Sequence, residues 1–519
     1  FWVLGKIQLH YLLSFLQVVD PLPSGVFGQF LLAKLPAISI SFLGSCSAYA
    51  IAPLLLRKFR QRAEKALRVE HIRGMQIQTV EELREAIKDK PGFIPLGPVT
   101  LPTAYEPEHV FIAGKTRVGK TVCMMQILQA VVKKNAKAVI YDFKGEYVER
   151  FYKAGRDHIM NPLDVRDCGW SVFNDIQHKH DIVAVVQSLI PAGQGEEKFF
   201  NTAAADVLRG MLFYLYQEGK RTNADIWELA TSPIEVIHKA CKSVEGGQAG
   251  ATYIQDSSSK QALGVVSTVI SYISWLEFAK DDGNFSIRKW LDEPGGGIIF
   301  LTGRPEVENT IRPMTGLFVD LLGKTFLSFP EDRERRVYFM LDEFGNMQQL
   351  PTIKRLLTAG GSKGAIVIIG IQDMAALQKN YGREDATTIY NSCGTTLVLN
   401  VADPDTAKFL SRRFGETQWW DANENHSMGT EDGRDGLSIS RQKRIEALIL
   451  DSEIMSLPKL KGYLKIPEQN PVLITLEIKE ANNLPVENQA FMMKDGLTLE
   501  DIVLKEINAV SAQQFGDFK

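Results

Sequence analysis

Hydrophobic and polar positions follow one repeated pattern over much of the chain. Short apolar runs at 109–114 and 136–142 are each followed by a glycine-containing turn and then by apolar residues at helical spacing. This order of strand, turn and helix predicts a parallel sheet with helices on both faces. Further strands are predicted at 295–303, 335–343, 364–372 and 394–401.

The strand pattern stops between about residues 165 and 282, where apolar residues recur at helical spacing. We therefore predict an all-α domain inserted into an α/β domain. A polar, glycine-rich stretch at 424–438 predicts a loop. The predicted limits are a transmembrane region at 1–56, a first α/β part with its linker at 57–164, the all-α domain at 165–284, a second α/β part at 285–483 and a C-terminal extension at 484–519.

The N-terminal region has the composition of a membrane anchor. Residues 35–56 contain no charge, and 22 residues in a helix span roughly 33 Å, enough to cross a bilayer core. The basic run 57–62 follows and predicts a cytoplasmic side. Because the sequence opens on Phe1, we expect the first residues to be the end of a preceding membrane helix. The alternatives are a buried helix or an uncleaved signal segment.

Composition adds few constraints. Apolar residues make up 45% and charged residues 23%, as in packed soluble proteins, and the net charge of −3 neither favours nor excludes nucleic acid binding. The five cysteines are scattered without a C-x-x-C pair, which weighs against a zinc site or a disulfide framework.

The clearest motif is GKTRVGKT at 114–121, between a predicted strand and a predicted helix. Its glycines let backbone N–H groups surround phosphate oxygens, Lys120 would reach the β- and γ-phosphates, and Thr121 would hold Mg²⁺. The alternative is a glycine-rich turn. The predicted nucleotide-binding residues of this loop are Gly114, Lys115, Thr116, Arg117, Val118, Gly119, Lys120 and Thr121.

Two carboxylates and a glutamine end later strands. Asp342 follows an apolar run and would hold Mg²⁺ through water, while Glu343 would polarise the attacking water. The alternative is the start of a helix. Gln372 ends another strand, where it would sense the γ-phosphate, and this order of elements favours a RecA-like core. Asp142 ends the second strand in YDFKGE and is predicted to bind nucleotide, with a helix cap as an equal alternative.

With these motifs placed, the chain resembles the coupling proteins of type IV secretion systems, in particular the TraD-type ATPases of conjugative DNA transfer. The resemblance rests on the phosphate loop and on several further stretches in matching order. These are YDFKGEYVERFY, NPLDVR at 161–166, LIP at 189–191, FSIRKWL at 285–291, LDEFGNMQQLP at 341–351, GIQ at 370–372, RDGLS at 434–438 and SLPKLKGYLKIP at 456–467.

The resemblance implies a RecA-like P-loop domain with an inserted all-α domain and N-terminal transmembrane helices, located at the bacterial inner membrane. It also implies a homo-oligomer, a hexamer, that uses ATP and Mg²⁺. Expected partners are DNA bound without sequence preference, the relaxase and accessory relaxosome proteins, other inner-membrane secretion components and the membrane itself.

One departure from the family pattern concerns the cation that acts across the subunit boundary. In the turn at 358–365, the position of the family's arginine is Gly361. Lys363 or Arg304 is then the candidate, and an ordinary salt bridge is the alternative for Arg304. The leading hypothesis is a DNA-translocating ATPase. A nucleotide-gated adaptor that recruits substrates with little turnover is the second.

Overall fold

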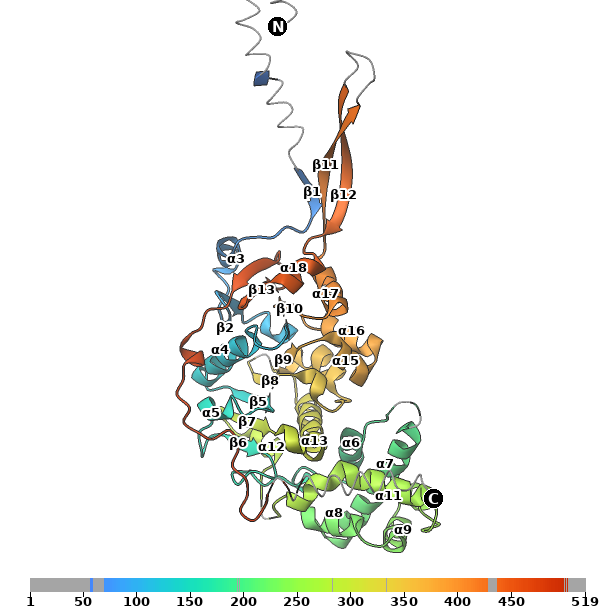
Figure 1. Cartoon of the computed structure of the whole chain (residues 1–519). Helices are drawn as coiled ribbons and strands as arrows, with labels where there is room; N and C mark the ends of the chain where they lie inside the picture. The colour runs from blue at the N-terminus through green and yellow to red at the C-terminus, as the bar shows by residue number, and fades with distance from the viewer. Residues whose placement is uncertain are drawn as a thin grey trace, which may run out of the picture. The chain divides into compact units, whose positions relative to one another are not determined.

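The computed structural model describes residues 57–58, 70–193, 195, 197–281, 283–332, 334–427, 436–498, 500 and 502 (Figure 1). The predicted transmembrane region at 1–56 lies outside these residues. None of the helices within the described ranges combines the length and the hydropathy needed to cross a bilayer. The chain divides into two compact units, one formed by Phe1–Arg73 and Thr417–Glu446, the other by Gly74–Glu416 and Ala447–Lys519.

The smaller unit contains a three-stranded sheet. Its strands are β1 (Glu70–Gly74), β11 (Glu416–Ser427) and β12 (Gly436–Ala447), in the order β1-β11-β12. The predicted loop at 424–438 is therefore wrong at both ends, because residues 424–427 and 436–438 belong to strands. Backbone hydrogen bonds between strands do not require an apolar face, so a polar, glycine-rich composition conceals such a pair from hydrophobic periodicity.

The larger unit is built on a nine-stranded sheet, and its central strands are parallel. Two C-terminal strands extend it in antiparallel orientation at one edge. All six predicted strands are confirmed. In spatial order the strands are β14 (Val472–Thr475), β13 (Lys461–Lys465), β10 (Thr395–Val398), β4 (Val110–Ala113), β9 (Ala365–Ile371), β8 (Val337–Leu341), β5 (Lys137–Asp142), β7 (Gly297–Thr302) and β6 (His158–Met160).

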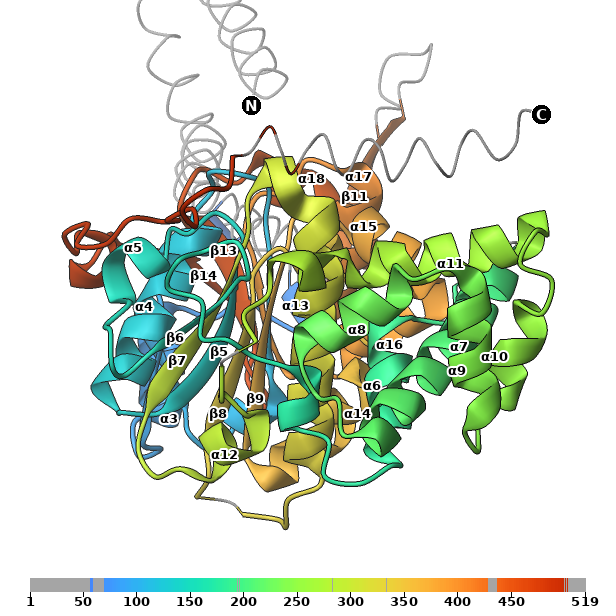
Figure 2. The same cartoon turned by 90° about the horizontal axis from the view of Figure 1, so that it is seen from below.

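Both faces of this sheet are covered, which explains why its central strands are buried at every position. In β4, Val110 and Ile112 pack into one core and Phe111 and Ala113 into the other. The first face carries α3 (Val80–Ile87), the hairpin β2 (Gly92–Leu96) and β3 (Val99–Pro102), α4 (Lys120–Lys133) and α5 (Val148–Phe151). The second core includes α13 (Glu308–Leu327), α14 (Ile353–Ala359), α15 (Met374–Tyr381), α16 (Arg383–Asn391), α17 (Pro404–Ser411) and α18 (Asp451–Ser456), together with α12 (Ile287–Asp292) (Figure 2).

The elements between residues 181 and 278 are all helical, and they lie beside the sheet with α13 next to them (Figure 2). One continuous core joins these helices to α13, and the exact limits of a separate all-α domain stay a prediction. The helices are α6 (Asp181–Leu189), α7 (Glu197–Glu218), α8 (Asn223–Ala230), α9 (Ile234–Ser243), α10 (Gln248–Tyr253) and α11 (Lys260–Ile273), followed by the short helix η3 (Ser274–Phe278).

The segment after β14 crosses the larger unit as an irregular strap. We call residues 484–498 the C-terminal strap. It contacts the segment after β5 through the backbone N–H groups of Glu487 and Asn488, which both donate to Glu149 O. Farther on it pairs with the NPLDVR segment at 161–166, where Val165 N–H donates to Met492 O and Lys494 N–H to Leu163 O.

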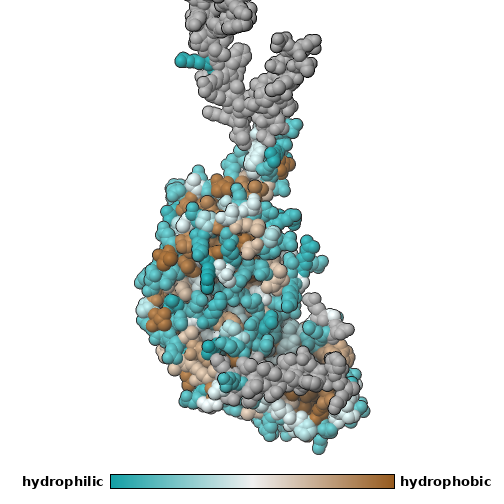
Figure 3. All heavy atoms as spheres, viewed as in Figure 1, coloured by the Kyte–Doolittle hydropathy of each residue, from teal (hydrophilic) through white to brown (hydrophobic). Residues whose placement is uncertain are grey.

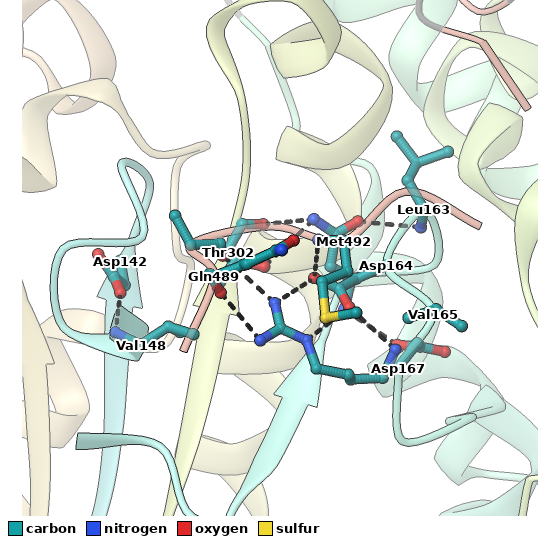
Figure 4. A network of polar contacts seen from close by, with 12 residues as sticks. Asp142, Val148, Leu163, Asp164, Val165, Asp167, Thr302, Gln489 and Met492 are labelled. Atoms are coloured by element: carbon teal, nitrogen blue, oxygen red, sulfur yellow. Dashed lines mark hydrogen bonds and ion pairs between the residues drawn. The ribbon is translucent and has the colours of Figure 1, made fainter. Parts of the chain in front are cut away.

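The NPLDVR motif supplies the polar centre of this strap contact (Figure 4). The Asp164 carboxylate is fully buried and accepts hydrogen bonds from the Arg166 guanidinium at 2.8 and 2.9 Å and from Met492 N at 3.1 Å. Arg166 also donates to Gln489 O at 2.9 Å. On the face of the molecule shown in Figure 3, hydrophobic residues form separate small areas within a mostly hydrophilic surface. The strap is held at this centre through polar and backbone contacts, and its side chains Phe491, Met493 and Leu497 pack against the second core.

Candidate nucleotide-binding site

The phosphate-loop motif connects the end of β4 to the start of α4, as the sequence predicts. Gly119 has a φ of +122°, and a Cβ at this position would lie 2.9 Å from Leu460 Cδ2. Gly114 is needed for packing instead, because its Cβ would lie 2.9 Å from Val118 Cγ2. The loop conformation therefore requires both glycines of the motif.

The loop divides into residues that line a pocket and residues that anchor it. Gly114 N–H donates to Ile371 O at 3.1 Å and Lys115 N–H to Asn400 O at 2.8 Å, and Val118 is buried behind the loop. The pocket is open and is lined by Lys115, Thr116, Arg117, Gly119, Lys120, Thr121, Val122, Lys144, Glu146, Glu343, Gln372 and Leu460. Six of the eight predicted loop residues therefore face the pocket, and Gly114 and Val118 support them.

Lys120 provides a direct test of whether the site fits phosphate. Its side chain is buried, and within the described part of the chain its ammonium makes no hydrogen bond. The nearest opposite charge is Asp342, whose Oδ1 lies 3.6 Å from Nζ. A buried ammonium without a hydrogen bond is costly, and phosphate oxygens would satisfy it. The residues present therefore fit a nucleotide phosphate.

Thr121 and Asp342, the predicted Mg²⁺ residues, line the same small pocket beside the loop. The Asp342 carboxylate is oriented by Tyr147, whose hydroxyl donates to Oδ2 at 2.9 Å, and by Glu343 N–H at 3.0 Å. The described residues contain no cluster of three or more His, Cys, Asp or Glu side chains placed to hold a metal. One hydroxyl and one carboxylate suit Mg²⁺, which takes its other ligands from phosphates and water.

Glu343 has a strained backbone and three hydrogen-bond partners. Its φ of +56° and ψ of +40° place it in the left-handed region, which costs a non-glycine residue about 1–2 kcal/mol. Its Oε1 accepts from Lys144 Nζ and from Gln372 Nε2, both at 3.0 Å, and Asn346 lies 3.5 Å from Oε2. The left-handed backbone therefore occurs at the residue whose carboxylate bonds two pocket residues, Lys144 and Gln372.

The structure also explains how Gln372 reaches Glu343. β8 and β9 are adjacent and parallel, with Leu341 opposite Ile369, so their C-terminal ends lie at one edge of the sheet. Gln372 follows β9 directly, and Glu343 lies two residues beyond the end of β8. The predicted water-activating and sensing residues are thus brought into direct contact.

Asp142 has the contacts of the alternative interpretation, a helix cap. Its Oδ2 accepts from Tyr147 N at 3.0 Å and from Val148 N at 2.8 Å, at the start of α5 (Figure 4). Burial raises the pKa of Asp142 to about 7, although these backbone hydrogen bonds oppose the shift. The side chain still lines the small pocket that contains Thr121 and Asp342. Its role toward nucleotide stays a prediction.

The two candidate trans-acting cations lie apart from this cluster. Arg304 pairs with Glu306 at 3.5 Å and stacks over the ring of Phe491 in the C-terminal strap, at 5.5 Å from its centroid. These are the ordinary contacts that the sequence left open for Arg304. Lys363 precedes β9, at the opposite end of that strand from Gln372, and its ammonium donates to Phe329 O. Among the described residues, those that line the pocket around the phosphate loop include neither Arg304 nor Lys363.

Two functional contacts were not predicted from the sequence. Lys144 lies in the YDFKGE stretch, and its bond to Glu343 depends on β5 and β8 being neighbours. The register pairs Tyr141 with Leu341, so the segments after both strands meet at one edge. Burial lowers the pKa of Lys144, but the hydrogen bond and charge of Glu343 more than compensate, and the net pKa is raised. The second missed contact, Tyr147 to Asp342, has the same origin.

Comparison with known families gives this site its context. Residues 94–477 match the model of the type IV secretion-system coupling protein DNA-binding domain. The chain belongs to this family. The matched range covers the phosphate loop, the helices at 181–278 and Gln372, so it includes the whole candidate site.

Individual relatives agree with the family. Coupling protein TraD of Escherichia coli K12 is 22% identical over 457 residues, which are 86% of this chain and 63% of the relative. Protein VirD4 of Agrobacterium fabrum is 24% identical over 339 residues, covering 60% of this chain and 50% of the relative. The chain thus spans between half and two thirds of the length of these relatives.

Solved structures show the same fold. The plasmid coupling protein TrwB in complex with the non-hydrolysable ATP analogue ADPNP has a TM-score of 0.72 and 25% identity, over 82% of this chain and 98% of TrwB. TrwB in complex with ADP and Mg²⁺ has a TM-score of 0.71 and 24% identity over the same shares. The mixed sheet with its helical segment is therefore the TrwB-like fold of this coupling-protein family.

Proposed function

We propose that this protein is the ATPase of a type IV secretion or conjugation system, acting at the bacterial inner membrane. It couples a relaxase–DNA substrate to the channel and uses ATP hydrolysis to drive translocation of DNA or protein. The observation that carries the proposal is the grouping of Lys120, Asp342, Glu343 and Gln372 at one edge of a parallel sheet. Membership of the coupling-protein family supports the substrate assignment.

The residues present suggest a division of labour in hydrolysis. The phosphate loop and Lys120 would hold the ATP phosphates, and Thr121 and Asp342 would hold Mg²⁺, which neutralises charge on the phosphate oxygens when bound. Glu343 would accept the proton of the attacking water. Gln372 holds the Glu343 carboxylate and lines the pocket, so it is placed to respond when the terminal phosphate leaves.

The assembly and its partners follow from the family. We expect a membrane-anchored homo-hexamer whose RecA-like domains place each nucleotide beside a neighbouring subunit. DNA contacts would be made to the phosphate backbone, so binding is expected to be independent of sequence and to weaken steeply with salt. The relaxase, the accessory relaxosome proteins and other inner-membrane secretion components are the expected protein partners.

A second candidate function is a nucleotide-gated adaptor that recruits substrates with little turnover. Gly361 stands where the family has its arginine, and the Lys363 ammonium is bonded to Phe329 O within the same chain. A site without an external cation would favour binding over hydrolysis. The intact Glu343–Gln372 pair favours the motor.

One experiment separates the two functions. ATP hydrolysis is measured on the detergent-solubilised full-length protein with DNA of increasing length, for the wild type and for Glu343→Gln. The motor predicts DNA-stimulated hydrolysis that falls about 10²- to 10⁴-fold in the variant, with ATP binding retained. Wild-type activity equal to that of the variant at every DNA length would reject the motor and leave the adaptor.

A further inference from the structure

One cation of the nucleotide pocket comes from outside the phosphate loop. Lys144 follows β5, and its ammonium lines the pocket together with Lys120 and Thr121. Its Nζ lies 3.0 Å from Oε1 of Glu343, the carboxylate assigned to water activation. Lys144 therefore lies where the attacking water and the terminal phosphate would meet.

The pair between Lys144 and Glu343 has the properties of a contact that can open. The Lys144 side chain is 55% exposed and that of Glu343 is 16% exposed, and half-exposed ion pairs contribute little to stability. While the pair is closed, Oε1 of Glu343 accepts hydrogen bonds from both Lys144 and Gln372. Those contacts occupy both lone pairs of Oε1, which is then closed to a water molecule.

The backbone that carries Lys144 is held firmly, although its side chain is not. The loop is closed by the Asp142 carboxylate on the N–H groups of Tyr147 and Val148, and by Gly145 N–H on Asp142 O at 3.1 Å. Gly145 has a φ of +75°, and a Cβ there would lie 2.6 Å from Cβ of Ala490 in the C-terminal strap. A fixed backbone and a flexible four-carbon stem let the ammonium move over a short range.

We propose that Lys144 is a catalytic residue whose ammonium moves from Glu343 to the terminal phosphate of ATP bound in the same subunit. This inference rests on the proposed ATPase function. The water oxygen forms a bond to the γ-phosphorus while the bond from that phosphorus to the bridging oxygen breaks. The bridging oxygen leaves with its electron pair on ADP, and Glu343 takes the proton of the water. Lys144 stays protonated and offsets the negative charge on the transferring group.

The turn at 358–365 makes this cation more important in this chain. It contains Gly361 and no arginine, and Lys363 donates to Phe329 O. Lys144 acts in cis, so the charge it supplies does not depend on a neighbouring subunit. It also links phosphate binding to base activation, because moving to the phosphate frees one of the two acceptor positions of Oε1 on Glu343.

The test compares Lys144→Gln with the wild type in the full-length protein. Affinities for a non-hydrolysable ATP analogue and for ADP are measured together with the rate of ATP hydrolysis. Lys144→Gln should lower the affinity for the analogue about tenfold or more, keep ADP affinity within about twofold and reduce kcat at least about a hundredfold. Lys144→Arg should retain most of the analogue affinity and part of the rate. Lys153→Gln removes an exposed lysine nine positions farther along the chain and should behave as wild type.

The outcomes distinguish this inference from the proposed function. Equal losses of ADP and analogue affinity would make Lys144 a structural residue, and unchanged affinities and rates would leave it an ion pair only. Either result overturns the inference while wild-type hydrolysis still supports the motor. If the wild type does not hydrolyse ATP, the motor fails, and the ratio of analogue to ADP affinity still decides whether Lys144 contacts the terminal phosphate.

Discussion

The contact between the C-terminal strap and the NPLDVR motif predicts a large local effect of a single substitution, Asp164→Ala. The Asp164 carboxylate is fully buried, and the Arg166 side chain, 14% exposed, is its partner at 2.8 Å. Breaking a buried pair by removing one member costs about 3–5 kcal/mol. The substitution also removes the acceptor of Met492 N–H, which lies in the strap.

We assign about 2 kcal/mol of that cost to opening of the strap, because one buried N–H and the arginine bonds to the strap depend on the carboxylate. This corresponds to about 30-fold faster amide exchange in the strap. Hydrogen–deuterium exchange of peptides covering 484–498 measures it, with peptides from α4 as an internal reference. Asp164→Asn keeps an acceptor, so its strap exchange rate should lie between those of the wild type and Asp164→Ala. Asp256→Ala removes an exposed carboxylate elsewhere in the chain and should leave the strap exchange rate as in the wild type.

Strap exchange within about threefold of wild type in a folded Asp164→Ala protein would refute this reasoning. The strap would then be held by its other contacts, which are its backbone pairing with residues 149–165, the side-chain bonds of Asn488 and Lys494, and the packing of its apolar residues against the core. If Asp164→Ala fails to fold, the Asp164→Asn variant supplies the same comparison, with acceleration confined to the strap as the expected result.

Two further predictions concern the loop after β5 and the opposite end of the sheet. Gly145→Ala places a Cβ at a φ of +75°, 2.6 Å from Ala490 Cβ. The backbone conformation alone should lower the stability of the folded state by about 1–2 kcal/mol, and amide exchange should accelerate in both the loop and the strap. Amide exchange unchanged from the wild type would contradict the contact. Burial raises the pKa of Glu106 from 4.5 to about 7, although the hydrogen bond from Tyr338 and the charge of Arg336 oppose this shift. Between these two pH values the folded protein therefore keeps a proton that the unfolded chain releases. Stability should therefore fall as pH rises from about 4.5 to about 7, and Glu106→Gln should flatten this part of the thermal midpoint–pH curve; an unchanged slope would contradict the assignment.

The sequence was most informative about the buried central strands and the functional residues that directly follow them. The central strands are buried at every position and mostly apolar, because both faces of the sheet are covered, so these strands could be located without a structure. The phosphate loop and the residues after β8 and β9 could then be placed at one edge by strand direction alone. The contact between Glu343 and Gln372 is a consequence of that geometry.

The remaining features depend on pairings that leave no local pattern. The end of β11 at 424–427 and the start of β12 at 436–438 lie in a polar stretch where a loop was expected. An aspartate after a strand, such as Asp142, suits either a nucleotide contact or a helix cap. The structure was needed to show that its carboxylate accepts hydrogen bonds from Tyr147 and Val148. To predict the hydrogen bond between Lys144 and Glu343, one must know that β5 lies beside β8. Hydrophobic periodicity does not reveal the spatial order of strands.

The C-terminal strap also has a consequence for how the protein forms during synthesis. Asn488 bonds Tyr152 across 336 positions of the chain, so the segment after β5 acquires its strap partner only near the end of translation. At about 5–20 residues per second, that interval is roughly 17–70 s. We expect a nascent chain to complete its phosphate loop first and to hold an unsupported Lys144 loop during this time. The loop that carries Lys144 would then gain its contact with Ala490 only once the strap has docked.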